Sequence, residues 1–284
     1  MASPYRSPTG AHQVHVWCSV GLASWSVPNE THEVATSCGQ THVVSAGTGD
    51  DDCVYLPGTN FNAASSTVLL GALASRCRVY AADLPGQPGL SAATRPDQEL
   101  PGYAAWLADV VAWVRRRHER GRIVLAGHSR GAAVALSAEP ESVDGLALLA
   151  PAGLTRVHPS IAMLRSTLPW LVWRNNSGAK RLLDYMSGPA HAPADHLVEW
   201  MTLVAATCRT TGAPGPLPDS NLISWKGHHV RIAAGEHDVF FPPDKLREPS
   251  RAKLGREPLV VAGAGHLLVD EEPALVSDLI TSLL

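Results

Sequence analysis

A serine stands at the centre of the pattern Gly127-His-Ser-Arg-Gly131, directly after an apolar, β-branched run. The run that begins at Arg122 predicts a buried strand, and the alanine-rich segment after Gly131 predicts a helix. Gly-x-Ser-x-Gly between a strand and a helix is typical of a tight, strained turn, in which the glycines keep Cβ atoms away from neighbouring backbone. The turn exposes the serine hydroxyl beside a helix N-terminus, where developing negative charge is stabilised. We therefore predict Ser129 as a nucleophile.

A serine hydroxyl is a poor nucleophile at neutral pH and needs a base within hydrogen-bond reach. His266 follows the last predicted strand, and Asp238 follows the strand before it. The imidazole of His266 can accept the serine proton, and the carboxylate of Asp238 can hold the imidazole in the required tautomer. Glu236 and Asp244 are alternatives for the acid, and a buried structural role is the alternative for His266. The chain order Ser129, Asp238, His266 favours the triad.

An oxyanion formed by attack on a carbonyl needs two fixed N–H donors. The backbone N–H of Arg130, the residue after the nucleophile, is the first predicted donor. The second is expected from the loop Leu56-Pro-Gly-Thr-Asn60, which follows an earlier strand and in which Gly58 permits close approach of the backbone. We predict Thr59 N–H as this donor. Asn60 is the alternative, and a plain turn without a role is the other interpretation.

Metal chemistry is disfavoured by the distribution of histidines and cysteines. The densest group is His228, His229, His237 and Asp238, but neighbours in a strand point to opposite faces, so His228 and His229 cannot easily bind one ion. There is no His-Glu-x-x-His pattern, and the five cysteines include no Cys-x-x-Cys. The run of Asp50–Asp52 is typical of a solvated loop. We expect neither a metal nor a cofactor.

These residues are predicted to lie at the ends of strands that alternate with helices. Alternating segments with apolar strands predict a mostly parallel sheet that is covered by helices on both faces. An antiparallel edge hairpin is expected over 33–45, with its turn at Cys38-Gly39, and residues 1–30 are expected to be a weakly patterned lead-in on the outside. The expected strands are 53–56, 78–82, 122–127, 143–150, 229–234 and 258–262, and the expected helices include 63–75, 103–118, 131–137 and 273–284.

The alternation stops between residue 152 and residue 226, where no buried strand is predicted. Helix-like segments joined by Pro/Gly-rich pieces occupy this stretch, so we expect a helical insertion over 153–225 within a core formed by 1–152 and 226–284. The insertion carries Trp170, Trp173 and Trp200. We predict that these three side chains, with Asn60, line a substrate pocket.

Composition limits the partners of the chain. Its 284 residues are 45% hydrophobic and 17% charged, which is sufficient for one large α/β domain with a sizeable core. The formal net charge of −3 argues against a nucleic acid or an anionic membrane as partner. The chain has no apolar run of about 18 residues and no signal-like start, so we expect a cytoplasmic protein acting on a small molecule with an apolar portion.

With these motifs in place, the chain resembles the α/β-hydrolase superfamily, especially its capped, esterase-like members, from about residue 32 to the C-terminus. The motifs that carry the resemblance also include Asp83-Leu-Pro-Gly-Gln-Pro-Gly-Leu-Ser91. The resemblance implies an eight-stranded, mostly parallel sheet with a helical cap between the sixth and seventh strands. It also implies that members using an aspartate nucleophile are excluded, because position 129 is serine. Leu56-Pro57 before Gly58, the bulky Arg130 and Ala132 depart from the usual pattern.

The resulting hypothesis is a serine hydrolase that cleaves a carboxylic ester, lactone or thioester through an acyl-enzyme on Ser129. One alternative is a lyase or cyclase of a specialised biosynthetic pathway, which would use the same residues as an acid–base device. Another is a non-catalytic ligand-binding protein. The side chain of Arg130 has two interpretations: it binds an acidic group on the flank of the sheet, or it reaches the pocket and selects an anionic substrate.

Overall fold

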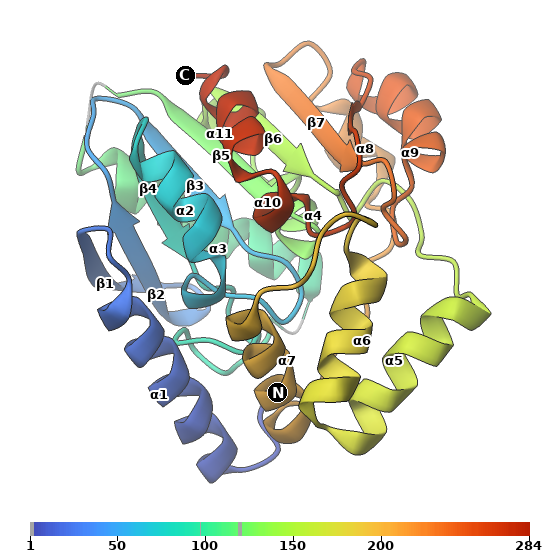
Figure 1. Cartoon of the computed structure of the whole chain (residues 1–284). Helices are drawn as coiled ribbons and strands as arrows, with labels where there is room; N and C mark the ends of the chain where they lie inside the picture. Colours follow the sequence, from blue (N-terminus) through green and yellow to red (C-terminus); the bar gives the residue numbers. More distant parts are fainter. Residues whose placement is uncertain (1–2, 97, 119–120) are drawn as a thin grey trace.

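The computed structural model describes residues 3–96, 98–118 and 121–284, so the prediction for the chain start falls partly outside it. Its centre is an eight-stranded sheet with the order β1-β2-β4-β3-β5-β6-β7-β8 (Figure 1). This confirms the predicted fold class. The strands are β1 (Asn29–Thr36), β2 (Gly39–Ala46), β3 (Asp52–Leu56), β4 (Arg78–Ala82), β5 (Ile123–His128), β6 (Gly145–Leu149), β7 (Val230–Gly235) and β8 (Leu259–Val261).

The antiparallel part of the sheet is confined to one edge. β1 and β2 form the predicted hairpin, with Thr36 opposite Gly39, and β2 runs antiparallel to β4. All other neighbouring strands are parallel, and β5, which leads to the serine turn, lies between β3 and β6. Because parallel strands end at the same edge, the segments that follow β3, β5, β7 and β8 are brought together there.

Helices cover both faces of the sheet, and the strands alternate their side chains between two apolar cores. Cys53 and Tyr55 of β3 lie in one core, whereas Val54 and Leu56 lie in the other, as the period of two requires. The first core includes α2 (Thr67–Ala74), α10 (Leu268–Glu271) and α11 (Pro273–Thr281). The second includes α3 (Glu99–Arg115), α4 (Arg130–Ala135) and α9 (Pro243–Pro249).

Four helices stand between β6 and β7 in the chain. They are α5 (Ile161–Trp173), α6 (Asn176–Met186), α7 (Asp195–Thr207) and α8 (Asp219–Ile223). α6 packs against both α5 and α7, and these three helices lie beside the sheet in the lower part of Figure 1. No helix in the described part of the chain is long and apolar enough to cross a membrane.

The N-terminal segment differs from the prediction. Instead of a weakly patterned lead-in, Pro8–Ser24 forms helix α1 (Figure 1). The side chain of Ser7 caps its first turn by accepting the Gly10 N–H, and Pro8 suits the first helical position. α1 packs against α7 and buries Val14 and Cys18, while its other face is exposed. The low amphipathic periodicity of this segment explains why the sequence pattern did not reveal the helix.

Candidate active site

Ser129 lies in the strained turn between β5 and α4. Its backbone has φ 52° and ψ −112°, an uncommon conformation for a residue with a Cβ atom. Gly127 and Gly131 make the turn possible, because a Cβ on Gly127 would collide with the backbone of Gly131 and a Cβ on Gly131 would collide with the carbonyl of Leu56. The turn places the serine side chain at the C-terminal end of the central strand.

The structure brings Ser129, His266 and Asp238 together from three strand ends. The Nε2 atom of His266 is 3.2 Å from Ser129 Oγ, and its Nδ1 atom is 3.0 Å from Asp238 Oδ2. Each of the three residues is at most 5% exposed. With Nδ1 protonated and donating to the carboxylate, Nε2 is free to accept the serine hydroxyl proton.

The environment of Asp238 favours its charged form. Burial alone would raise the pKa of this carboxyl, but the charge and hydrogen bond of His266 and the N–H groups of Phe241 and Phe240 outweigh it and lower the pKa. Both N–H groups donate to Oδ1 at 2.9 Å. The carboxylate is therefore held ionised and aimed at the imidazole.

The two alternative acids lie elsewhere. Glu236 is exposed, and its Oε2 accepts the backbone N–H of Gly263 at 2.9 Å. Asp244 lies in the first turn of α9, with its side chain beside Lys245. Neither carboxylate contacts His266, so the geometry favours Asp238 as the orienting acid.

The loop after β3 lies against the serine turn. A Cβ on Gly58 would be 3.0 Å from Nδ1 of His128 and 3.4 Å from Cβ of Ser129, so glycine permits this approach. The Asn60 N–H donates to Gln87 Oε1 at 3.1 Å and is already engaged. Within the described chain, the N–H groups of Thr59 and Arg130 have no such internal partner. The geometry thus favours Thr59 over Asn60 as the second donor.

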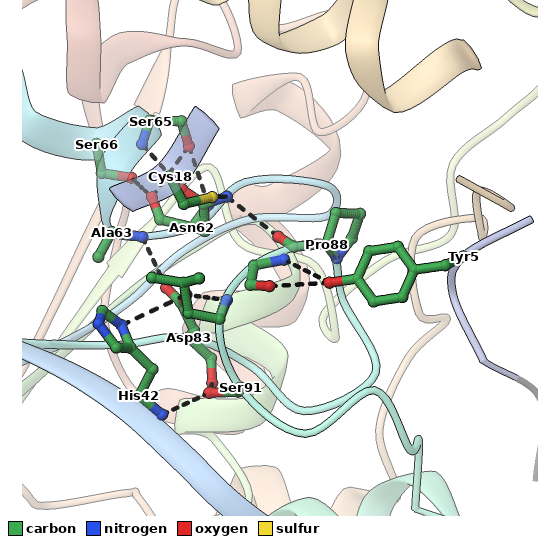
Figure 2. Close-up of polar contacts among 12 residues, drawn as sticks. Tyr5, Cys18, His42, Asn62, Ala63, Ser65, Ser66, Asp83, Pro88 and Ser91 are labelled. Atoms are coloured by element: carbon green, nitrogen blue, oxygen red, sulfur yellow. Dashed lines mark hydrogen bonds and ion pairs between the residues drawn. The ribbon is translucent and has the colours of Figure 1, made fainter. Parts of the chain in front are cut away.

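A buried polar network fixes this loop to the loop after β4 (Figure 2). The carboxylate of Asp83 accepts the N–H groups of Ala63 and Leu90 at 2.8 and 2.9 Å. The side-chain amide of Asn62 donates to the Pro88 carbonyl at 3.1 Å. The two loops are joined at several points, so the backbone that carries Thr59 is preorganised.

The side chain of Arg130 is almost fully buried. Its guanidinium forms an ion pair with Glu99 at the start of α3 and donates from Nε to Thr59 Oγ1 at 3.2 Å. Its Nη2 donates to the Gly212 carbonyl at 2.6 Å and to Thr211 Oγ1 at 3.2 Å. Arg130 therefore binds an acidic group on the flank of the sheet, and it also connects the Thr59 loop to the segment after α7.

A cavity of about 440 Å³ opens at Ser129 and His266. Its walls are mainly apolar and include Met163 and Trp170 of α5 and Met201 of α7. The cavity lining that the structure gives contains no Lys, Arg, Asp or Glu side chain. Such a site suits an uncharged, apolar ligand.

The predicted lining residues have different positions. Asn60 and Trp170 line the cavity, and the Trp170 indole donates to the Met201 carbonyl at 2.7 Å. The prediction for Trp173 is wrong, because this side chain is 62% exposed and faces solvent. The prediction for Trp200 is also wrong, because it is fully buried against Trp17 of α1. Its indole donates to the Asn60 carbonyl, so it supports the cavity from behind.

Three supporting residues were not predicted. Gln87 holds the Asn60 N–H, as described above. Glu271 accepts the N–H groups of Gly265 and Gly188 at 2.6 and 2.9 Å, which fixes the backbone just before His266. His128 donates from Nε2 to the His266 carbonyl at 2.9 Å, and burial, then the neighbouring His266, lower its pKa to about 3. His128 and Gln87 lie within motifs that the sequence shows, whereas Glu271 carried no sequence signal.

The described residues give no support for a metal site. Across residues 3–96, 98–118 and 121–284, no group of three or more His, Cys, Asp or Glu side chains is arranged to hold a metal ion. His228 lies beside Trp225 and His237 beside Glu236, so the two belong to separate surroundings.

A family model described as "Alpha/beta hydrolase family" matches residues 53–279. The chain belongs to this family. The match begins at β3 and ends within α11, so it includes the serine turn and both other strand ends of the site. The family resemblance seen in the sequence is confirmed.

Two similar proteins come from Bacillus subtilis (strain 168). "Carboxylesterase YbfK" is 25% identical over 277 residues, which cover 93% of this chain and 90% of the relative. "Uncharacterized carboxylesterase nap" is 24% identical over 269 residues, covering 90% and 87%. A crystal structure of naproxen esterase from Bacillus subtilis superposes with a TM-score of 0.77 at 22% identity, covering 96% of each chain. This likeness shows that the α/β-hydrolase fold extends over nearly the whole chain.

Proposed function

We propose that this protein is a serine hydrolase of carboxylic esters that works through an acyl-enzyme on Ser129. The observation that carries the proposal is the hydrogen-bonded series from Ser129 through His266 to Asp238, which opens into an apolar cavity. The names of the two curated relatives, both carboxylesterases, support an ester over a lactone or thioester.

In the first half of the reaction, His266 Nε2 takes the proton of Ser129 as Oγ attacks the ester carbonyl. The N–H groups of Thr59 and Arg130 donate to the oxyanion, and Asp238 stabilises the imidazolium that forms. The tetrahedral intermediate then expels the alcohol, which His266 protonates. The product of this half is an ester between Ser129 and the acyl group.

In the second half, His266 accepts a proton from a water molecule, which attacks the acyl carbon. A second tetrahedral intermediate collapses, the acid leaves, and the proton returns to Ser129. Strained backbone at Ser129 and the fixed loop at Thr59 mean that these groups need little rearrangement as charge develops.

We also propose that residues 153–225 act as a cap over a core formed by residues 1–152 and 226–284. The support is that α5, α6 and α7 contribute Met163, Trp170, Leu182, Met186 and Met201 to the cavity walls. Apolar walls exclude water and strengthen the electrostatic interactions at the reacting carbonyl. They also favour substrates with an uncharged, apolar acyl or alcohol group.

The test compares wild type with Ser129→Ala on p-nitrophenyl esters of increasing chain length, a thioester and a lactone. We expect ester turnover in the wild type and its loss, by about 10⁴-fold or more, in the variant. Circular dichroism would establish that the variant remains folded. Turnover that survives the substitution would refute the proposal, and turnover of the lactone or thioester alone would refute the ester assignment.

A further inference from the structure

Helix α5 exposes an unusual apolar surface to solvent. Ile161, Leu164, Leu168 and Val172 are 72%, 61%, 51% and 61% exposed. Their spacing of three and four residues places them along one side of the helix, and we call this set the α5 ridge. Single exposed apolar residues are ordinary on a protein surface, but a continuous row marks a binding surface.

The opposite side of α5 faces the cavity. Met163, Thr167 and Trp170 of the same helix line the wall of the site that contains Ser129. Only Arg165, Ser166 and Thr167 are polar among the thirteen residues of the helix. A helix that is apolar on all sides is normally enclosed. α5 is enclosed on one side only, so its outer side is available to a further apolar environment.

The chain segment that contains α5 is cationic. Residues 153–187 contain five Arg and Lys side chains and one carboxylate, which gives a formal charge of +4, whereas the whole chain carries −3. Arg156, Arg165 and Arg174 are exposed, and within the described chain they form no ion pair. They stand before, on and directly after the helix. The chain as a whole is negatively charged, which disfavours an anionic membrane, but the segment around α5 is positively charged.

We propose that the α5 ridge binds the surface of an anionic lipid bilayer, with the helix lying in the plane of the interface. Apolar side chains in a row enter the boundary between headgroups and acyl chains, while the flanking arginines reach the anionic headgroups. The charge of +4 complements such a surface. A neutral apolar partner would give these exposed cations no counter-charge.

This placement also gives a route for the substrate, a consequence that rests on the proposed ester hydrolysis. Because one helix contacts lipid on one side and the Ser129 cavity on the other, an ester dissolved in the bilayer lies about one helix diameter, roughly 10 Å, from the cavity. This arrangement would favour hydrolysis of an uncharged, water-insoluble ester.

The experiment measures co-flotation with vesicles and uses the Ser129→Ala protein, so that no lipid is consumed. We expect binding to vesicles of phosphatidylglycerol and phosphatidylcholine, weaker binding at high salt, and little binding to phosphatidylcholine alone. Adding Leu164→Ser and Leu168→Ser to the Ser129→Ala protein should weaken its binding about tenfold or more. Adding Arg165→Gln and Arg174→Gln to the Ser129→Ala protein should weaken vesicle binding about fivefold per arginine.

The matched control is Leu259→Ser with Leu275→Ser, an exposed leucine pair on β8 and α11, away from the insertion. It should bind vesicles as the parent does. In the background with Ser129 intact, the Leu164/Leu168 variant should turn over a water-soluble short-chain ester normally, which reports a folded site. If the wild type and the variants with Ser129 intact all failed to turn over the ester, the proposed function would be refuted. The lipid proposal would still be decided by vesicle binding.

Three results would overturn the lipid proposal. The first is no binding to the phosphatidylglycerol vesicles at low salt. The second is equal binding by the Leu164/Leu168 variant and its parent. The third is self-association, measured by sedimentation equilibrium, that disappears in the Leu164/Leu168 variant while vesicles are not bound, because the α5 ridge would then be an interface between two copies of the chain.

Discussion

The C-terminal edge of the sheet and the outer side of α5 differ in the polarity and the burial of their side chains. At the sheet edge, Ser129, Asp238 and His266 are polar, buried and hydrogen-bonded to one another. On α5, the leucines of the ridge are apolar and exposed. Buried polar groups are usually hydrogen-bonded to fixed partners, whereas a continuous exposed apolar row is expected where a binding partner covers it.

This contrast separates two tasks. Parallel strands of fixed register position the proposed triad, because Ser129, Asp238 and His266 each come after the last paired residue of a strand. The helices of the insertion, which lie outside the sheet, form the cavity walls and the outer surface. Changes at the sheet edge should therefore affect the chemical step, whereas changes on α5 should affect which molecules reach it.

The largest effect is expected from Asp238→Asn. The amide keeps the shape of the side chain but favours the wrong tautomer of His266, so kcat should fall by about 10⁴-fold with little change in KM. Steady-state kinetics on a p-nitrophenyl ester measure this. Glu236→Gln is the matched control and should keep its activity. If Glu236→Gln were the damaging change, the assignment of the acid would be wrong.

A smaller effect is expected from Arg130→Gln. The substitution removes the ion pair with Glu99 and the bonds that hold Thr59 and Gly212, so the oxyanion donor is less well positioned. We expect kcat/KM to fall by about 10–100-fold, mainly through kcat. Glu99→Gln, which leaves the bonds to Thr59 and Gly212, should lose less. Urea unfolding of both variants separates a loss of stability from a loss of positioning.

Two neighbouring residues on α5 test the contrast directly. Met163 faces the cavity and Leu164 faces solvent. Met163→Glu puts a carboxylate into an apolar wall and should raise KM for a long-chain ester by about tenfold. Leu164→Glu should leave the KM of the same ester, measured in solution without vesicles, unchanged. Equal effects from the two substitutions would contradict the inner and outer assignment.

The smallest effect is expected at Asp270 of α10, a polar group that breaks the pattern of the sheet edge. Its Oδ1 is buried without a partner in the described chain, and burial, with the neighbouring Glu271, raises its pKa to about 7. The folded state then holds a proton that the unfolded state releases above about pH 4, so stability falls as pH rises from about 4 to 7. Asp270→Asn should raise Tm by a few degrees at pH 8 and by less at pH 4. An equal change at both pH values would contradict this account.

The strand-end residues were predictable from the sequence because the rules that place them are local. Gly127 and Gly131 indicate the turn at Ser129, and the positions of Asp238 and His266 follow from the strands before them. Parallel pairing then brings the three together without further information. The mostly parallel sheet was predictable from the alternation of strands and helices, and its eight strands were implied by the family resemblance.

The insertion and the supporting contacts were less accessible. Trp173 and Trp200 are both aromatic residues of the insertion, yet one faces solvent and the other is buried behind Asn60. Their orientation depends on how helices pack, which spacing alone does not give. Arg130 contacts Glu99 and Gly212, and both of these residues are far from it in the sequence. The local charge of α5 was obscured by the sum over the chain.

The central claim is an acyl-enzyme on Ser129, and trapping it is the most direct measurement. Wild type mixed rapidly with excess p-nitrophenyl ester and quenched in acid should gain the mass of one acyl group. Peptide mapping should locate that group on Ser129, with a burst of p-nitrophenolate of matching size. Ser129→Ala should show neither. An acyl group on another residue, or steady ester turnover by Ser129→Ala, would contradict the mechanism.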